Sequence, residues 1–285
     1  MDKPIIASPQ VTQHILNRFK LRADKKLGQN FLIDENVVHQ IVAAAELSEA
    51  DTVLEVGPGI GTLTQGLAES KARVVAVELD TRLLPVLATT LNGYDNVRVV
   101  HGDILKVNIM EEVGAPSFKV CANLPYYITS PIVMHLLESR LPFGSITVMV
   151  QKEAAERLCA EIPGRAVGAV TLAAAYYAER EILFSVPRGS FTPSPNVDSA
   201  VIRFTLRGGP AVAVQDERLL FRLIRGAFEH RRKTLVNSVS SAGVCAKEIL
   251  LAGLERLGIA ATVRAEELTL EQFAALANAI DDVRA

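Results

Sequence analysis

Tryptophan is absent from this 285-residue chain, and only three cysteines occur, Cys121, Cys159 and Cys245. Because they are odd in number and form no CxxC pair, they support neither a disulfide framework nor a zinc cluster, and we predict no metal site. No hydrophobic run approaches the roughly 20 residues that a membrane-spanning helix needs, and the N-terminus lacks the apolar core of a secretory signal. We therefore expect a soluble, cytoplasmic protein.

Overall charge is also low, at −2, and gives no global argument for a polyanionic partner. Its distribution is uneven, however. Residues 18–26 contain five lysines and arginines against one acid, Asp24, and residues 218–233 contain six against one acid, Glu229. These two basic segments could line a face that binds phosphates, or they could be solvated helix faces, and charge alone favours neither interpretation.

Short β-branched runs alternate with longer amphipathic stretches through the first half of the chain. This alternation is typical of βα units and predicts an α/β fold with a doubly wound, mostly parallel sheet. Two further runs follow each other directly and predict an antiparallel hairpin at one edge, which makes seven strands. The predicted strands are residues 52–56, 73–77, 97–100, 118–122, 145–151, 181–186 and 198–206.

A change of pattern near residue 207 indicates a second domain. The stretch RGGPAVAVQDE, residues 207–217, has two glycines, a proline and no long hydrophobic period, as expected of a linker. Beyond it, residues 217–239, 246–258 and 269–281 repeat apolar side chains at helical spacing. We predict a sheet domain over residues 1–206 and a small helical domain over residues 207–285.

The stretch LEVGPGIGTLT, residues 54–64, has the pattern of a strand, a glycine turn and the start of a helix. Gly57 and Gly59 would let the backbone approach a ligand closely. The dinucleotide fingerprint GxGxxG needs a third glycine at position 62, where this chain has Thr62. That departure weakens the prediction of a dehydrogenase.

Two acids follow the next two strand runs. Glu78 stands 21 residues after Gly57, where a carboxylate can accept hydrogen bonds from both ribose hydroxyls, and Asp103 could accept from an adenine amino group. Taken alone, each acid is better explained as an ordinary polar residue at the end of a strand than as a ligand-binding residue. A glycine turn and two acids at three successive strand ends together predict a pocket for an adenosine-bearing ligand without an essential phosphate, namely S-adenosylmethionine.

The fourth strand run is followed by the motif NLPY, made of Asn123, Leu124, Pro125 and Tyr126. If the nucleophile is an amine such as adenine N6, an Asn carbonyl and a backbone carbonyl held by the proline could accept its two hydrogens and free its lone pair. Tyr126 could stack on the extracted base. A turn with aromatics in the core is the alternative for such a string.

A second aromatic, Phe191, stands on a proline-stiffened stretch, SFTPSPNVDSA, and could cover the other face of the same base. A core phenylalanine at the sheet edge is the alternative.

Taken together, seven blocks resemble the bacterial small-subunit ribosomal RNA adenine N6,N6-dimethyltransferases, whose loss confers kasugamycin resistance. The resemblance extends over nearly the whole chain. The blocks are LGQNFL (27–32), EVGPGIGTLT (55–64), ELD (78–80), GDIL (102–105), NLPYYI (123–128), FTPSPNVDSAV (191–201) and AFEHRRKTL (227–235).

The resemblance implies a Rossmann-like methyltransferase domain over residues 1–206, with S-adenosylmethionine as cofactor and an RNA- or ribosome-binding role for residues 207–285. It further implies transfer of two methyl groups to each of two adjacent adenosines, in the hairpin loop near the 3′ end of 16S RNA in immature small subunits. We expect a monomer. The implied cofactor-binding residues are Gln29, Asn30 and Leu32 at the methionine end, Gly57 and Gly59 in the turn, Glu78 at the ribose, Asp103 at the adenine, and Asn123, shared with catalysis.

Three competing functions stay open at this point. The macrolide-resistance methyltransferases, which modify one adenosine of large-subunit RNA, share the glycine loop and an NLPY-like motif. VDSAV and the basic AFEHRRKTL segment look more like the small-subunit family, and Tyr127, where some members have asparagine, is within the family range. An assembly factor in which methylation is secondary is the second possibility. The third is a small-molecule methyltransferase, which would leave the basic segments unexplained.

Overall fold

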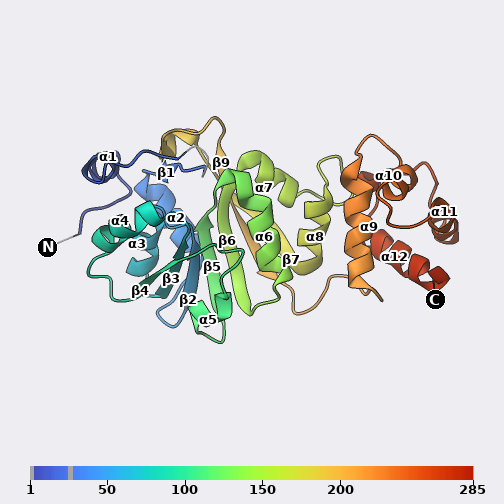
Figure 1. The fold of residues 1–285 in the computed structure, drawn as a ribbon, viewed down its shortest axis with the longest axis horizontal. Coiled ribbons are helices and arrows are strands. Elements are labelled where there is room, and N and C mark those ends of the chain that lie inside the picture. Colours follow the sequence, from blue (N-terminus) through green and yellow to red (C-terminus); the bar gives the residue numbers. More distant parts are fainter. Residues whose placement is uncertain (1–2, 25–27, 285) are drawn as a thin grey trace. The chain divides into compact units, whose positions relative to one another are not determined.

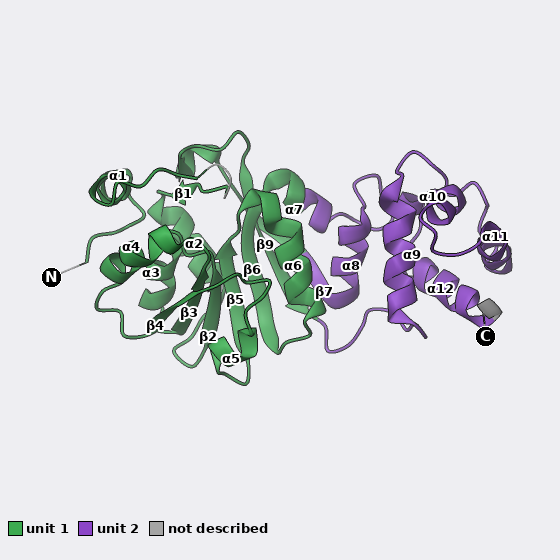
Figure 2. Ribbon diagram, in the orientation of Figure 1, with its two compact units in different colours: residues 1–155, 181–206 green, residues 156–180, 207–285 purple. Residues whose placement is uncertain are grey.

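The structure, a computed structural model, describes residues 3–24 and 28–284, so Lys25, Lys26 and Leu27 of the predicted segments lie outside the described residues. The chain forms two compact units (Figure 2). The first contains residues 1–155 and 181–206, and the second contains residues 156–180 and 207–285. One division falls at the expected residue 206, but residues 156–180, which we expected in the sheet domain, belong to the second unit.

A seven-stranded sheet has the order β4-β3-β2-β5-β6-β9-β7 (Figure 1). The pairs β4-β3, β3-β2, β2-β5 and β5-β6 are parallel, and β9 runs antiparallel to β6. The prediction of a mostly parallel α/β sheet with two late strands at one edge is thus confirmed. The strands are β2 (Thr52–Val56), β3 (Arg73–Glu78), β4 (Val97–His101), β5 (Phe118–Asn123), β6 (Phe143–Gln151), β7 (Ala178–Val186) and β9 (Ser199–Leu206).

The central strands are buried on both faces. In β2 and β3 nearly every successive side chain is inaccessible to solvent, which is why these strands are continuous apolar runs rather than alternating ones. The register aligns Val56 of β2 with Val77 of β3. Because parallel strands end at the same edge, the residues that follow β2, β3, β4 and β5 come together there.

Helices connect most of the parallel strands of the first unit. Asp34 caps α2 by accepting from the backbone N–H groups of Asn36 and Val37, and α3 begins directly after the glycine turn. The helices are α1 (Pro9–Arg18), α2 (Glu35–Ala44), α3 (Thr62–Glu69), α4 (Leu84–Thr90), α5 (Ile109–Val113) and α6 (Thr129–Glu138), while α7 (Lys152–Leu158) contains residues of both units.

A separate two-stranded sheet, which we did not predict, pairs β1 (Phe31–Leu32) with β8 (Phe191–Thr192). Leu32 is aligned with Phe191, and the Ser190 hydroxyl donates to Asp34 Oδ2 at 2.9 Å. This sheet fixes the segment before α2 against the proline-rich stretch before β9. Strands of two residues carry no periodic signal, so the sequence pattern could not reveal them.

The second unit is helical, as predicted for the end of the chain, and residues 207–216 between β9 and α9 form no helix or strand. The stretch 217–239 is not one helix, because α9 ends at Glu229 and Thr234 starts a new helix by accepting from the Asn237 N–H at 3.4 Å. The helices are α8 (Ala169–Tyr177), α9 (Glu217–Glu229), α10 (Leu235–Ser241), α11 (Lys247–Arg256) and α12 (Leu270–Arg284).

Candidate functional site

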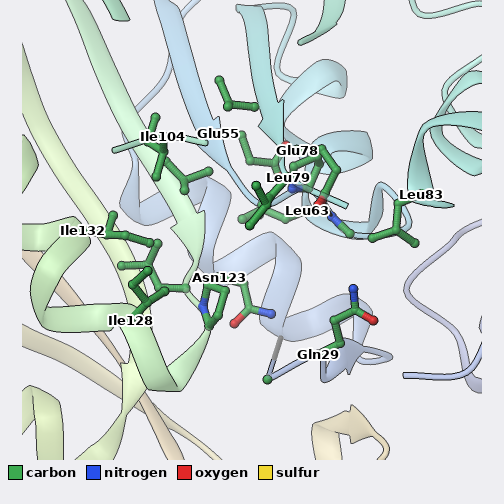
Figure 3. A pocket seen from close by; sticks show the side chains of 18 of the residues that line it. Gln29, Glu55, Leu63, Glu78, Leu79, Leu83, Ile104, Asn123, Ile128 and Ile132 are labelled. Atoms are coloured by element: carbon green, nitrogen blue, oxygen red, sulfur yellow. Dashed lines mark hydrogen bonds between the residues drawn. The ribbon is translucent and has the colours of Figure 1, made fainter. Parts of the chain in front are cut away.

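A pocket lies in the first unit where β2, β3 and β5 end (Figure 3). It is lined by every site residue that the sequence analysis predicted, with the exception of Phe191. These lining residues are Gln29, Asn30, Leu32, Gly57, Gly59, Glu78, Asp103, Asn123, Leu124, Pro125 and Tyr126. The sheet topology therefore brings together groups that are up to about a hundred positions apart in the sequence.

The glycine turn has the backbone conformation that only glycine adopts readily. Gly57 and Gly59 have φ angles of 68° and 62°. A Cβ atom added at Gly57 would have no other atom within 4 Å, so the space in front of this residue is open to a ligand. Gly61, at φ 92°, then starts α3.

Glu78 ends β3 with its carboxylate oriented by the turn. Its Oε2 accepts from the Gly59 N–H at 3.1 Å, and its Oε1 accepts from the Asp80 N–H at 2.7 Å. The side chain is buried, and this burial raises the pKa of Glu78, while the two backbone N–H groups act in the opposite direction. Each oxygen keeps a further acceptor position, as the predicted contact with two ribose hydroxyls requires.

Asp103 follows β4 and lines the pocket. Its Oδ1 accepts from the Leu105 N–H at 3.1 Å, and its Oδ2 lies 3.5 Å from the Lys106 ammonium. The carboxylate is fixed by its own turn and retains acceptor capacity toward the pocket.

The side-chain amide of Asn123, the last residue of β5, points into the pocket (Figure 3). Within the described part of the chain, no hydrogen bond engages this amide. The carbonyl of Pro125 is occupied, because it accepts from the Ile128 N–H and the Thr129 hydroxyl, both at 3.2 Å. Among the described hydrogen bonds none ends on the Leu124 carbonyl, so this is the carbonyl beside the proline that remains free to accept.

Tyr126 lines the pocket, and its hydroxyl group is fixed by a hydrogen bond. Its hydroxyl lies 2.6 Å from the Ser199 hydroxyl, at the start of β9. Burial raises the pKa of the Tyr126 hydroxyl, and the negative charge of Asp198 raises it further. The hydrogen bond with Ser199 lowers it, but by less than burial raises it. Ser199 was not predicted, although it lies in the VDSAV block, because the spacing of 73 residues gives no sign of the contact.

Phe191 is placed differently from the expectation. Its side chain is only 3% exposed and packs with Leu32 and Val201 in the core of the first unit. The pairing of β8 with β1 turns the ring inward, so that in this arrangement it does not cover a base. The stacking of Phe191 on a base stays a prediction, and it would require the segment around β8 to move.

The sequence analysis did not single out Glu55, which lies in β2 two residues before Gly57. The residue is 1% exposed, lines the pocket, and its Oε2 has no hydrogen-bond partner among the described residues. Burial raises the pKa of Glu55 to about 8, opposed by Thr64 and reinforced by the charge of Glu78. At neutral pH this carboxyl is therefore mostly protonated, and its presence inside an apolar strand is the signal that could have identified it.

We expect Glu55→Gln to become more stable relative to the unchanged protein as pH rises from 6 to 8. The folded pKa of about 8 lies above the ordinary value of 4.5, so the folded Glu55 keeps a proton that the unfolded chain has released. The Glu55 contribution to stability therefore falls by up to about 1.4 kcal/mol per pH unit, most steeply below pH 7 to 8, and glutamine removes that loss. Urea unfolding at several pH values measures it, and a stability difference independent of pH would contradict it.

Among the described residues, basic side chains of both segments are exposed, each within its own unit. Arg18, Lys20 and Arg22 are exposed in the first unit. In the second unit, Arg218, Arg222 and Arg225 of α9 share one exposed face. No ion pair within the described residues engages the side chains of Arg222 and Arg225.

Two further expectations concern absences. Across residues 3–24 and 28–284, no group of histidines, cysteines and acids is arranged to hold a metal ion. No helix in the same residues combines the length and the apolar character that a bilayer crossing demands.

A parallel sheet whose strand ends bring together a glycine turn, a buried carboxylate and an NLPY motif has the arrangement of the Rossmann-like methyltransferases. Solved structures support this. A dimethyladenosine transferase from Plasmodium falciparum superposes with a TM-score of 0.72 at 26% identity, covering 86% of this chain and 95% of the other. The 23S rRNA methyltransferase ErmE gives 0.66 at 28% identity, covering 88% of this chain and 100% of the other.

The chain belongs to the ribosomal RNA adenine dimethylase family, whose model matches residues 20–282. It is 49% identical to the ribosomal RNA small subunit methyltransferase A of Lachnoclostridium phytofermentans, covering 97% of this chain and 98% of the relative. The protein of the same name from Geobacillus thermodenitrificans is 48% identical, covering 96% and 97%. The predicted family, enzyme class and cofactor, S-adenosylmethionine, are thereby confirmed.

Proposed function

We propose that this enzyme transfers methyl groups to N6 of two adjacent adenosines in the hairpin loop near the 3′ end of 16S RNA, giving N6,N6-dimethyladenosines late in small-subunit assembly. The observation that carries the chemistry is that, among the described residues, no hydrogen bond engages the Asn123 amide or the adjacent Leu124 carbonyl, both in the pocket lining. The small-subunit relatives at 48–49% identity favour this substrate over large-subunit RNA, the substrate named for the more distant ErmE.

The pocket residues fit S-adenosylmethionine, which supplies an electrophilic methyl group when bound. Glu78 would accept from the ribose hydroxyls, and Asp103 would accept from the adenine amino group. The open space in front of Gly57 suits a close approach to the ligand. Asn30 and Leu32 line the end of the pocket that we assign to the methionine part.

Catalysis would follow from positioning of the target amine. Asn123 Oδ1 and the Leu124 carbonyl would accept the two N6 hydrogens and draw the nitrogen toward a tetrahedral shape, which frees its lone pair to attack the methyl carbon. The nitrogen would become acidic only as the new C–N bond forms and the methyl carbon–sulfur bond breaks to leave S-adenosylhomocysteine, and the amine proton would then pass to solvent. The chain therefore needs no strong general base, and its contribution is orientation and charge stabilisation.

Tyr126 would stack on the base after it leaves the RNA loop, since its ring lines the pocket and its hydroxyl is fixed by Ser199 at 2.6 Å. A hairpin loop needs little unpairing to release a base.

The exposed basic segments would bind RNA phosphates, with residues 207–285 as a helical RNA- and ribosome-binding domain. We further propose that the enzyme acts as a monomer on immature small subunits in the cytoplasm. Such contacts would select one RNA loop by fixing the register of the RNA on the protein, whereas the preference for adenine would come from the pocket, because phosphate contacts do not read bases.

Replacing Arg218, Arg222 and Arg225 together with glutamine should raise the KM for small-subunit substrate about tenfold and leave S-adenosylmethionine affinity unchanged. Each lost phosphate contact should also reduce the slope of log K against log salt by about 1. Arg256→Gln, which removes an exposed arginine of α11 paired with Asp282, is the matched control. Unchanged KM and salt slope in the triple variant would contradict RNA binding by α9 and favour a small substrate.

A further inference from the structure

Both ends of the Gln29 side-chain amide are held by other residues of the first unit. Gln29 Nε2 donates to Asp80 Oδ2 at 2.9 Å, and Gln29 Oε1 accepts from the Asp24 N–H, also at 2.9 Å. The backbone N–H of Gln29 donates to the Asp24 carbonyl at 3.2 Å. The amide thus connects its own segment to the residues that follow β3. The family resemblance, in contrast, implies that Gln29 contacts the methionine end of the cofactor.

Asp80, at the centre of this network, follows the proposed ribose ligand by two residues. Its own N–H donates to Glu78 Oε1 at 2.7 Å, and its side chain is 6% exposed. Arg82 binds both carboxylate oxygens, with Nε 2.9 Å from Oδ1 and Nη2 2.7 Å from Oδ2. The hydrogen bonds from Arg82 hold the pKa of Asp80 below its ordinary value. The carboxylate is therefore charged and doubly bonded at neutral pH.

Arg82 extends the network back to the N-terminal segment, because its Nη2 lies 3.3 Å from Asp24 Oδ2. Gln29 is hence fixed to Asp80 across 51 positions of sequence, and Asp24 to Arg82 across 58. Contacts between residues so far apart in the sequence form only when the first unit folds. They hold the segment that contains Gln29 against the pocket.

The segment held in this way, residues 28–32, lines the pocket from end to end. Gly28 lies next to Tyr126 and Tyr127, because a Cβ atom added at Gly28 would lie 3.2 Å from the Tyr127 ring and 3.7 Å from the Tyr126 nitrogen. A displacement of Gln29 would therefore alter the wall of the cofactor pocket.

We infer that Asp80 and Arg82 are positioning residues, which fix residues 28–32 across the cofactor pocket through Gln29 without touching the cofactor. This inference rests on the cofactor site proposed above. It also assigns Gln29 a bracing role, in place of direct contact with the methionine end.

A purely local role is the competing explanation, because Asp80 also caps the short 3-10 helix Thr81–Leu83 by accepting from the Arg82 N–H at 3.0 Å. A local cap would affect folding stability and leave cofactor affinity unchanged. Asparagine caps helices as well as aspartate does, so Asp80→Asn preserves this role. It offers only one acceptor oxygen, however, and cannot serve Arg82 and Gln29 together.

The test is calorimetric titration of the full-length protein with S-adenosylhomocysteine, together with kcat at saturating S-adenosylmethionine. We expect Asp80→Asn and Arg82→Gln each to raise the Kd about tenfold, with kcat within twofold of the unchanged enzyme. Gln29→Glu alone should be worse, because it places two carboxylates in contact. Combined with Asp80→Asn it should recover most of the affinity, since the new amide can donate to the new carboxylate.

The control is Arg98→Gln, which breaks a different arginine–carboxylate pair, between Arg98 of β4 and Glu112 of α5, and it should bind normally. If Asp80→Asn and Arg82→Gln both bind within twofold of the unchanged protein while Glu78→Ala loses binding, the positioning role is wrong and the cofactor site stands. If Glu78→Ala also binds normally, the cofactor site itself is wrong, and the inference fails with it.

Discussion

Replacing Asn123 with alanine should lower kcat for methyl transfer by about 10²–10³, the usual cost of removing one oriented hydrogen-bonding group from the reacting centre. The amide is the polar group at the end of β5 that no described residue engages, and it points into the pocket (Figure 3). Without its oxygen, one N6 hydrogen has no acceptor and the lone pair stays delocalised in the ring. Single-turnover transfer of labelled methyl groups to small subunits measures the loss.

Two controls make this result specific. Asn36→Ala removes an exposed asparagine at the start of α2 and should leave kcat unchanged. Asn123→Ala should still bind immature subunits, which separates catalysis from a role in subunit assembly. Retention of kcat within tenfold of the unchanged enzyme would show that Asn123 is not the group that prepares the amine.

Glu78→Ala should raise the Kd for S-adenosylmethionine about 100-fold. Charge-assisted hydrogen bonds contribute about 1.5–3 kcal/mol each, and the variant would lose those expected from the ribose hydroxyls. It also leaves the N–H groups of Gly59 and Asp80 without their acceptor, so the glycine turn loses its support. Calorimetry with S-adenosylhomocysteine gives the affinity directly.

Glu138→Ala, an exposed acid at the end of α6, is the matched control and should bind normally. At saturating S-adenosylmethionine, the kcat of Glu78→Ala should lie within about tenfold of normal, because the carboxylate does not touch the reacting atoms. An affinity within fivefold of the unchanged protein would contradict the assignment of Glu78 to the ribose.

Central strands were predictable because burial on both faces demands uninterrupted β-branched residues, and residues 52–56 match β2 at both ends. The pairing of β1 with β8 was not, since two residues form no pattern. The interruption between α9 and α10 was missed for a related reason. Apolar spacing continues across it, and only the cap at Thr234 marks the new helix.

The strand-end residues of the site were predictable because parallel topology alone brings Gly57, Glu78 and Asn123 to one edge. Residues that act through others were not predictable in this way. Ser199 reaches Tyr126 across 73 positions and Asp80 reaches Gln29 across 51, and no local spacing reports such contacts. For Glu55 the signal existed, an acid within an apolar strand, but its protonation depends on burial that only the fold creates.

The most direct test of the proposed function is to incubate the enzyme with methyl-labelled S-adenosylmethionine and, separately, with immature unmethylated small subunits or protein-free large-subunit RNA, and then to digest the RNA to nucleosides. We predict label in N6,N6-dimethyladenosine from the small subunit alone. Label from large-subunit RNA alone, or no label from either substrate, would contradict the proposed function.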